Sequence, residues 1–201
     1  MGVHLSIKAK LVLAANAGKE LKSAMEEFNR ACNTLSELAF QRDLHRKYDI
    51  HHTGYHLIRE ETNLPAQHMI DVIAKVTNGY TCEPNKFHRF KPHSSVRYDA
   101  RTMVLGHDCY AASLTICPKG RLTGQLQMSA RMRKQLCADE PGSAELVYRK
   151  GSFYLHISIT IPAPGVPEPS GSLGVDLGVN RVAVTSNKKF HTAKKIRHKK
   201  A

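Results

Sequence analysis

The feature that most constrains the fold of this chain is a proline-rich segment near its C-terminal end. Between Pro162 and Gly171 there are four prolines and two glycines. Such a segment is stiff and extended, and it continues neither a helix nor a sheet. It predicts a linker at residues 163–172, which separates a large unit, residues 1–162, from a short unit, residues 173–201.

The large unit begins with a strand and continues with helices. In residues 3–13 apolar residues alternate with Lys8 and Lys10, which is the period of a strand. In residues 17–80 apolar side chains recur at positions i, i+3, i+4 and i+7, on one face of a helix. Three helices are expected: a long one ending near Arg42, a short one over Tyr55–Glu61 after a polar interval at His45–Thr53, and one that has Pro65 in its first turn and ends at Gly79.

Residues 94–162 indicate antiparallel β-structure. Two hairpins are predicted: residues 113–117 with 122–128 around a Pro-Lys-Gly-Arg turn, and residues 145–148 with 153–161 around an Arg-Lys-Gly-Ser turn. After the linker, residues 173–186 predict two more strands around a glycine-containing turn. Because strands and helices occupy separate stretches of the chain, the expected fold class is α+β.

Positive charge is concentrated in two places. The chain has 30 lysines and arginines against 17 acids, a formal net charge of +13. Residues 86–93 interleave cations with aromatic residues, and residues 187–201 hold seven cations and no acid. The candidate nucleic-acid-binding cations are Lys86, Arg89 and Lys91 in the first stretch and Lys188, Lys189, Lys194 and Lys195 in the second.

We interpret this charge as favouring a nucleic-acid partner, because cations that meet phosphates release condensed counterions. A solvated loop and tail, an acidic protein partner or an anionic lipid surface fits the same charge.

The N-terminus lacks a basic head followed by an apolar run, and no stretch reaches the about 18 apolar residues of a membrane span. A soluble, cytoplasmic protein without a membrane partner is therefore expected.

The cysteines and histidines indicate no metal or disulfide site. The five cysteines include no Cys-x-x-Cys pair, which argues against a disulfide framework and a zinc knuckle. The histidines of the helical region have no companion acid at ligand spacing, so surface or capping roles are expected for them. These histidines are His51, His52, His56 and His68.

Asp176 is a lone acid in an apolar strand, flanked by Val175 and Leu177 and then by two glycines. An unpaired buried carboxylate is costly, so its position requires an explanation. It could be a magnesium ligand, since hard oxygen donors hold the ions of two-metal phosphate chemistry. It could equally cap a turn or pair with a lysine of the basic tail. The residues alone leave both interpretations open.

The order of these features resembles the N-terminal portion of the TnpB/OrfB family, the RNA-guided nucleases encoded by insertion sequences and related to type V CRISPR effectors. The resemblance covers most of the chain, and the segment Leu173–Val184, similar to the first RuvC motif, is its most specific part. The other matching segments are the initial basic strand, Phe28–Asn33, Arg59–Gln67, Val96–Asp99 and Leu146–Leu155.

The resemblance implies a wedge-like oligonucleotide-binding β-barrel at residues 1–15 and 86–162, with a helical recognition insertion at residues 16–85. An RNase H-like (RuvC) domain would begin at residue 173 and be represented here by its first strands only. Guide RNA and target DNA would be the partners, with base pairing supplying sequence recognition. The same resemblance places Gln67 and Arg97 at nucleic-acid-facing positions, although Gln67 also fits an ordinary surface glutamine.

In the family Asp176 would be the first catalytic carboxylate and a ligand of Mg²⁺. The family nuclease also requires two further acids and a cysteine-rich zinc ribbon, and the 25 residues after Asp176 contain no acid. One carboxylate holds a divalent ion weakly, so no stably bound Mg²⁺ and no autonomous cleavage are expected. Whether the chain is an enzyme stays open on sequence alone.

Three explanations fit this truncated pattern: a decayed transposon remnant, a fragment of a longer reading frame, or a short product that binds nucleic acid without cutting it. In each, residues after about Ser170 are expected to be poorly packed. An RNA-binding or DNA-binding module unrelated to transposons, such as a ribosomal or tRNA-binding protein, is the alternative. The sequence does not set the oligomeric state.

Overall fold

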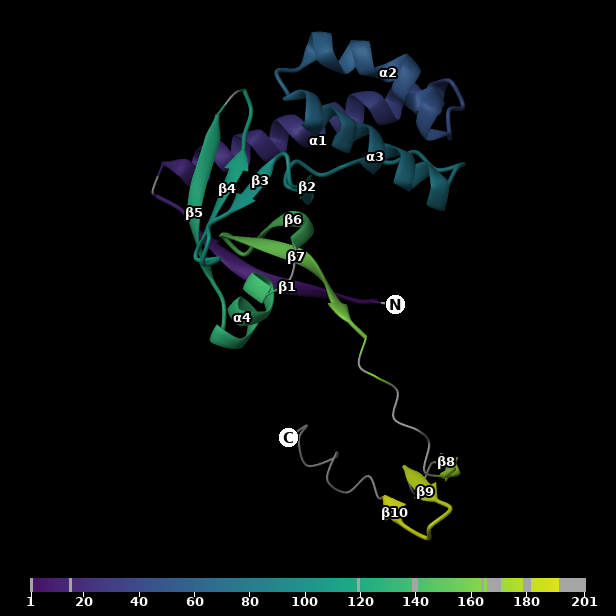
Figure 1. Cartoon of the computed structure of the whole chain (residues 1–201). Helices are drawn as coiled ribbons and strands as arrows, with labels where there is room; N and C mark the ends of the chain where they lie inside the picture. The colour runs from purple at the N-terminus through teal and green to yellow at the C-terminus, as the bar shows by residue number, and fades with distance from the viewer. Residues whose placement is uncertain are drawn as a thin grey trace. The chain divides into compact units, whose positions relative to one another are not determined.

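The described residues form both α-helices and antiparallel β-strands, which confirms the predicted α+β class (Figure 1). The computed structural model describes residues 2–14, 16–118, 120–138, 141–163, 165, 171–178 and 182–191. The chain divides into two units, Met1–Ala163 and Pro164–Ala201, with the boundary in the predicted linker. No helix in these described ranges has the length and apolar character that crossing a membrane requires.

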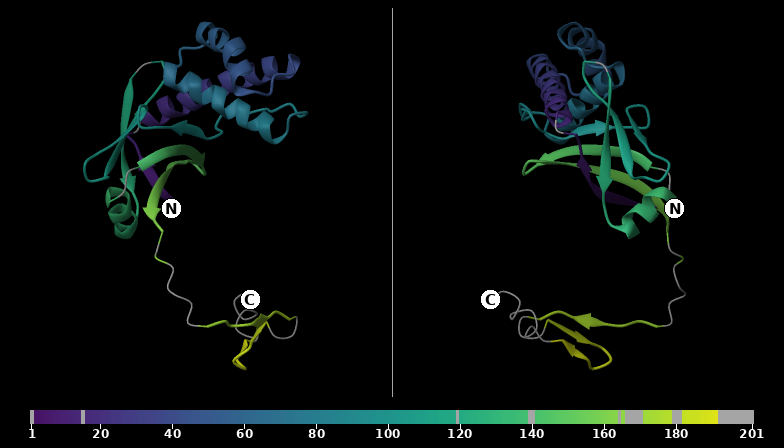
Figure 2. Two further views of the ribbon diagram at one scale, coloured as in Figure 1. Left: turned by 45° about the vertical axis from the view of Figure 1, so that its right-hand side comes forward. Right: turned by 90° about the vertical axis from the view of Figure 1, so that its left-hand side faces the viewer.

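Seven antiparallel strands of the first unit form one curved sheet that nearly closes into a barrel (Figure 2). Their order is β2-β6-β7-β1-β5-β4-β3. The strands are β1 (Gly2–Val12), β2 (Val96–Tyr98), β3 (Met103–Leu105), β4 (Ala111–Thr115), β5 (Arg121–Gln127), β6 (Pro141–Arg149) and β7 (Ser152–Pro162). Both predicted hairpins are confirmed, as β4–β5 and β6–β7.

Strand β1 joins the two hairpins into one sheet, although both lie far from it in the sequence. It pairs with β7 over most of its length and with β5 at its C-terminal end. Ile7, Ala9 and Leu11 are buried, whereas Lys8 and Lys10 between them are exposed, as the predicted alternation requires. This alternation fixes the pairing register, because a shift by one residue would bring the lysines into the core.

Helices α1 (Ala17–Gln41), α2 (Lys47–Glu61) and α3 (Ala66–Cys82) pack together beside β2, and the short helix α4 (Ala130–Ala138) lies apart from them (Figure 1). The apolar stripe of α1, which includes Leu21, Phe28 and Leu35, is buried in this bundle. The predicted long first helix is therefore confirmed.

The start of α2 differs from the prediction. The helix begins at Lys47, so most of the polar interval His45–Thr53 is helical. Ile50, Gly54 and Ile58 are its buried residues, and a single apolar residue in the first half of the helix was too little signal for the sequence pattern.

The ends of α3 also differ slightly. Pro65 precedes the helix as its N-cap, and the helix continues through Gly79 to Cys82. Gly79 does not end the helix, so glycine is needed at this position for another reason. A Cβ atom there would lie 3.1 Å from the His88 ring, so glycine lets the following segment pass close to the helix.

The second unit contains three short strands in the order β10-β9-β8. They are β8 (Val175–Asp176), β9 (Ala183–Thr185) and β10 (Phe190–His191). The two predicted strands after the linker are present as β8 and β9. Large apolar side chains of this unit are exposed, among them Leu173 at 56% and Leu177 at 75%. This agrees with the predicted poor packing after Ser170.

Candidate nucleic-acid interface

Residues 86–95 connect α3 to β2 and lie along α1; we call this segment the strap. It runs antiparallel to α1 and is held by α1 side chains. Asn33 Nδ2 donates to the Phe90 carbonyl at 3.0 Å, and the Phe90 N–H donates to Asn33 Oδ1 at 2.8 Å. Ser36 Oγ donates to the His88 carbonyl at 2.6 Å. The basic stretch, predicted within the barrel or as a solvated loop, is therefore fixed to a helix.

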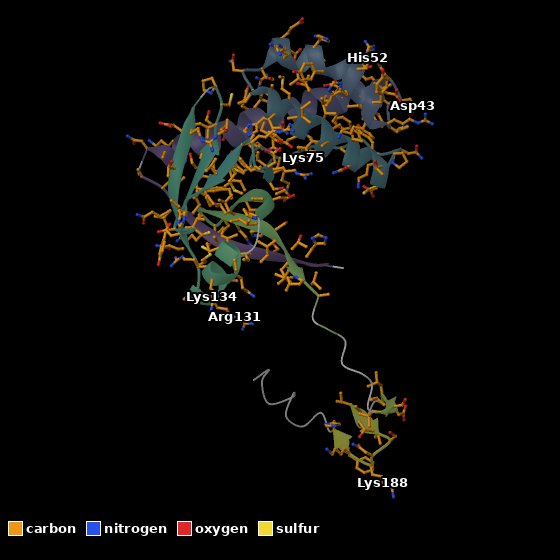
Figure 3. All side chains as sticks on the ribbon, viewed as in Figure 1. Asp43, His52, Lys75, Arg131, Lys134 and Lys188 are labelled. Carbon is orange, nitrogen blue, oxygen red and sulfur yellow. The ribbon has the colours of Figure 1, made fainter. Side chains whose placement is uncertain are left out.

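A buried amide and a half-buried lysine fasten the end of the strap. Asn29 Nδ2 donates to the Ser94 carbonyl at 2.9 Å. Lys75 Nζ donates to Asn29 Oδ1 at 2.9 Å and to the Ser95 carbonyl at 2.6 Å, and it lies 5.1 Å from the centre of the Phe90 ring (Figure 3). Desolvation lowers the pKa of Lys75 below its ordinary value. We therefore interpret Lys75 as a structural residue that holds the strap, not as a ligand-binding residue.

Arg89 and Lys91 are the strap cations that remain available to a ligand. Both are exposed, and within the described part of the chain neither forms an ion pair. They line a groove of about 660 Å³ between the strap and α1, which we call the basic groove. The α1 residues of this groove are Glu26, Asn29, Arg30 and Asn33.

A second groove, of about 580 Å³, adjoins the basic groove and shares Asn33 and Arg89 with it; we call it the aromatic groove. Phe40 of α1 and Phe87 of the strap line it and meet edge to face, with ring centres 5.6 Å apart. Its remaining lining residues are Glu37 and Gln41 of α1.

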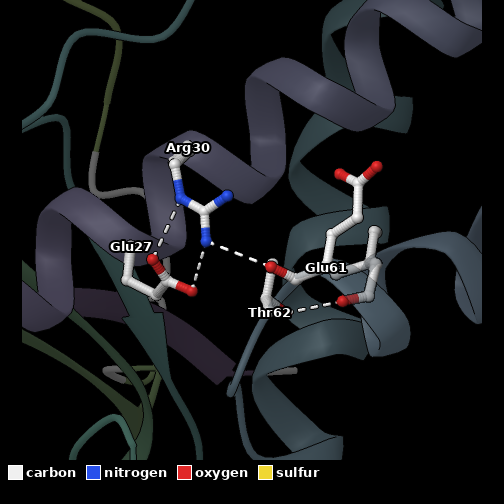
Figure 4. A network of polar contacts seen from close by, with 5 residues as sticks. Glu27, Arg30, Glu61 and Thr62 are labelled. Atoms are coloured by element: carbon white, nitrogen blue, oxygen red, sulfur yellow. Dashed lines mark hydrogen bonds and ion pairs between the residues drawn. The ribbon is translucent and has the colours of Figure 1, made fainter.

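The other cations near the basic groove already have partners. Arg30 donates to the Glu27 carboxylate at 2.7 and 3.0 Å and to the Glu61 carbonyl at 3.2 Å, which also ties α1 to the end of α2 (Figure 4). Lys86, a predicted binding residue, pairs with Glu83 at 2.9 Å. The structure thus separates Lys86 from Arg89 and Lys91, although all three belong to one basic stretch.

Gln67 and Arg97 lie in a different place, near the first turn of α3 and on β2. Gln67 Nε2 donates to Asp99 Oδ2 at 2.9 Å, and Arg101 donates to Gln67 Oε1 at 2.8 Å. Arg97 is exposed and pairs in register with Glu145 of β6. The side-chain amide of Gln67 is thus engaged on both sides, and Arg101 is a further exposed cation beside it.

Two buried titratable groups lie behind this polar cluster. Burial and, to a smaller extent, the nearby Asp99 carboxylate raise the pKa of Asp71 to about 6. The positive charge of Arg97 lowers this pKa, but by less. Burial lowers the pKa of His68 to about 4. Asp71 Oδ2 and His68 Nε2 have no hydrogen-bond partner among the described residues. His68 was expected at the surface or in a cap, but it is buried, with its ring 5.3 Å from that of Tyr98.

Lys188 and Lys189 belong to the second unit, in the turn between β9 and β10 (Figure 3). Both are exposed, and their backbone contacts hold the turn: the Lys188 N–H donates to the Thr185 carbonyl at 2.8 Å. Lys194 and Lys195 lie outside the described residues.

Asp176 lies on β8, paired in register with Val184, and its side chain is exposed. It borders a shallow site of about 410 Å³ made otherwise of glycine, valine, threonine and serine. The described residues contain no group of three histidine, cysteine or carboxylate side chains that could hold a metal ion. A single exposed carboxylate does not provide the ligand set of a two-metal site, so the residues present do not fit stable Mg²⁺ binding.

Sequence reasoning missed the polar residues that position the strap. Asn29, Asn33 and Ser36 follow one another at spacings of four and three, within the stripe of α1 that is otherwise apolar. Polar residues at buried helix positions signal a partner segment that needs hydrogen bonds. The spacing could therefore have indicated a chain segment along α1, though not which one.

No protein-family model matches the chain, and no curated protein sequence matches it either.

Proposed function

We propose that these 201 residues form the nucleic-acid-binding part of a TnpB-like protein, which binds guide RNA and DNA without cleaving DNA by itself. The observation that carries the proposal is that Arg89 and Lys91 are exposed, without an ion pair among the described residues, on a strap whose backbone is fixed along α1. A fixed backbone presents cations at low entropic cost, and such a groove tracks a phosphate chain.

The element order supports the TnpB-like part of the proposal. Helices α1–α3 are inserted in the sequence between β1 and β2 of a barrel-like antiparallel sheet, and Asp176 follows on the first strand of a separate unit. The wedge-like oligonucleotide-binding barrel and the RuvC-like start are the finer assignments that we propose for these two units. The lone acid after the linker supports binding without autonomous cleavage.

The binding test measures the affinity of the protein for a structured guide-type RNA across about 50–200 mM salt. Log affinity should fall linearly with log salt, by about 0.9 for each neutralised phosphate. Arg89→Gln with Lys91→Gln should weaken binding several-fold and reduce the slope by about 2. Lys86→Gln removes a single positive charge from the same strap, at an ion-paired site, and it should change binding less than Lys91→Gln alone. Affinity that does not vary with salt would refute the proposal.

The cleavage test mixes the protein, guide RNA, Mg²⁺ and target DNA and looks for cut product. We expect none, and Asp176→Ala should leave RNA affinity unchanged. Magnesium-dependent cutting that Asp176→Ala abolishes would show that these residues suffice for catalysis.

A further inference from the structure

Two phenylalanines of the aromatic groove are unusually exposed. Phe40 retains 47% and Phe87 43% of its accessible surface, whereas Phe28 on the same helix is buried. The two exposed rings come from α1 and the strap and meet at 64°. An edge-to-face pair leaves a stacking position on a ring face unused. Phenylalanine is usually an interior residue, so two exposed rings lining one groove indicate a binding surface.

The size and position of the groove suit an unpaired nucleotide. Its volume of about 580 Å³ lies within the range of ~300–1,000 Å³ that is usual for ligand sites. Arg89 lines both grooves, and Lys91 lines the adjoining basic groove. A chain that threads both grooves would bring phosphates to the cations and a base to the rings, which is the combination found in single-strand binders.

One residue of the groove, Glu37, is an acidic hydrogen-bond acceptor. Glu37 is exposed, and its Oε1 accepts a hydrogen bond from Gln41 Nε2 at 3.3 Å. An ionised carboxylate is an acceptor only and repels phosphate, but it can accept a hydrogen bond from the ribose 2′-hydroxyl. Deoxyribose has no such donor, so the carboxylate disfavours DNA relative to RNA.

We propose that the aromatic groove binds an unpaired nucleotide of a single-stranded RNA segment. Its base stacks on the Phe40–Phe87 pair, its phosphate meets Arg89, and its 2′-hydroxyl donates to Glu37. Bases in a duplex are already stacked and do not offer their faces, so a duplex does not fill this groove. The inference deepens the proposed function and rests on it, because it locates one part of the RNA.

The test uses the full chain and a short fluorescein-labelled adenosine oligoribonucleotide, followed by fluorescence anisotropy. Phe87→Leu keeps an apolar side chain but removes the ring face, and it should weaken binding about five-fold or more. Tyr48→Leu is the matched control, since Tyr48 is an exposed aromatic residue of α2 that lines neither groove. Urea unfolding of each variant checks that the fold is kept.

Each outcome separates the stacking site from the proposed function. A loss with Phe87→Leu for the single strand, but not for a blunt-ended RNA duplex, supports the inference. Unchanged single-strand binding by Phe87→Leu, with weaker binding by Arg89→Gln and Lys91→Gln, overturns the inference and leaves the proposed function standing. Equal affinity for the matching DNA oligonucleotide, unchanged by Glu37→Gln, overturns the assignment to RNA.

Discussion

At the scale of single residues, a buried amide determines where the candidate interface lies. Asn29 is fully buried within the apolar stripe of α1, a position where a polar group is costly unless it is hydrogen-bonded. It is bonded on both atoms, through Nδ2 to the strap carbonyls and through Oδ1 to Lys75. This residue therefore links α1, α3 and the strap. By fixing the strap backbone, it also fixes the positions of the exposed Arg89 and Lys91.

Replacing this amide should destabilise the whole first unit. Asn29→Leu should lower the free energy of unfolding by about 2–4 kcal/mol, because it leaves the Pro92 and Ser94 carbonyls without their donor and the Lys75 ammonium with the Ser95 carbonyl alone. Urea unfolding measures the change. Adding Lys75→Met to Asn29→Leu should restore part of the loss, since both partners are then apolar. Losses that simply add would show that the two side chains are not coupled.

Asp71 should make the stability of the protein depend on pH. Its folded-state pKa of about 6 lies above the ordinary value of 3.8, so the folded protein favours the protonated acid. Stability from this group is therefore complete below about pH 4 and decreases as the pH rises through about 6. Asp71→Asn should raise the free energy of unfolding by about 1–2 kcal/mol at pH 7.5, less than the full shift because solvent partly screens the site.

The same substitution should have little benefit at pH 4, and urea unfolding at both values tests this. His68 also titrates in this range, with the opposite sign, but it is present in both proteins and cancels in the comparison. An equal effect of Asp71→Asn at both pH values would contradict the raised pKa.

Single-residue roles that depend on distant parts of the chain were not predictable from the sequence. The sequence indicated Arg89 and Lys91 as binding candidates, and both are exposed and form no ion pair with another described residue. It also indicated Lys86, which is exposed and pairs with Glu83 three residues earlier. The role of Asn29 depends on residues more than 60 positions away, and no local pattern contains that information.

At the scale of elements, the packing of α2 on α1 depends on a missing side chain. A Cβ atom at Gly54 would overlap Leu35 Cδ1 and lie 3.8 Å from Leu38 Cδ2. Leu35 is fully buried, and side chains in a close-packed interior move aside only at a cost. Glycine at this helix position therefore permits a close approach of the two helices.

Alanine at this position should be harmful despite its better helix propensity. Gly54→Ala gains up to about 1 kcal/mol of propensity but overpacks the interface at a cost of about 1–3 kcal/mol. We expect a net loss of stability in thermal or urea unfolding. Glu60→Ala, at an exposed position of the same helix, is the control and should lie within about 0.5 kcal/mol of the parent. A Gly54→Ala protein more stable than the parent would show that the helices can separate without cost.

Elements with strong local signals were predictable, and short or polar ones were not. The hairpins β4–β5 and β6–β7 carry both alternation and turn residues, so both were found. Strands β2 and β3 have three residues each, too few to establish a period. Helix α4 buries only Leu136, so its sequence lacks an apolar stripe. The central position of β1 is a long-range pairing that composition cannot reveal.

At the scale of the whole molecule, the second unit carries nearly half of the net charge, but none of its described residues belongs to the buried core. The core lies in the first unit, whereas the described part of the second unit consists of short strands with exposed apolar residues. Residues 164–201 nevertheless contain eight lysines and arginines against two acids. The second unit therefore contributes strongly to the net charge of +13 while adding little buried apolar surface.

A protein ending at Ala163 should consequently keep its stability and lose part of its RNA affinity. Its urea unfolding midpoint should match that of the full chain, because each unit has its own set of contacts. Its affinity for RNA should be lower and its salt dependence less steep, by about 0.9 for each lost phosphate contact. Lys188→Gln with Lys189→Gln in the full chain is the control for length and should reproduce part of the change. If the shortened protein bound RNA with an unchanged slope, the interface would be confined to the first unit, and Arg89 and Lys91 would have to account for the salt dependence.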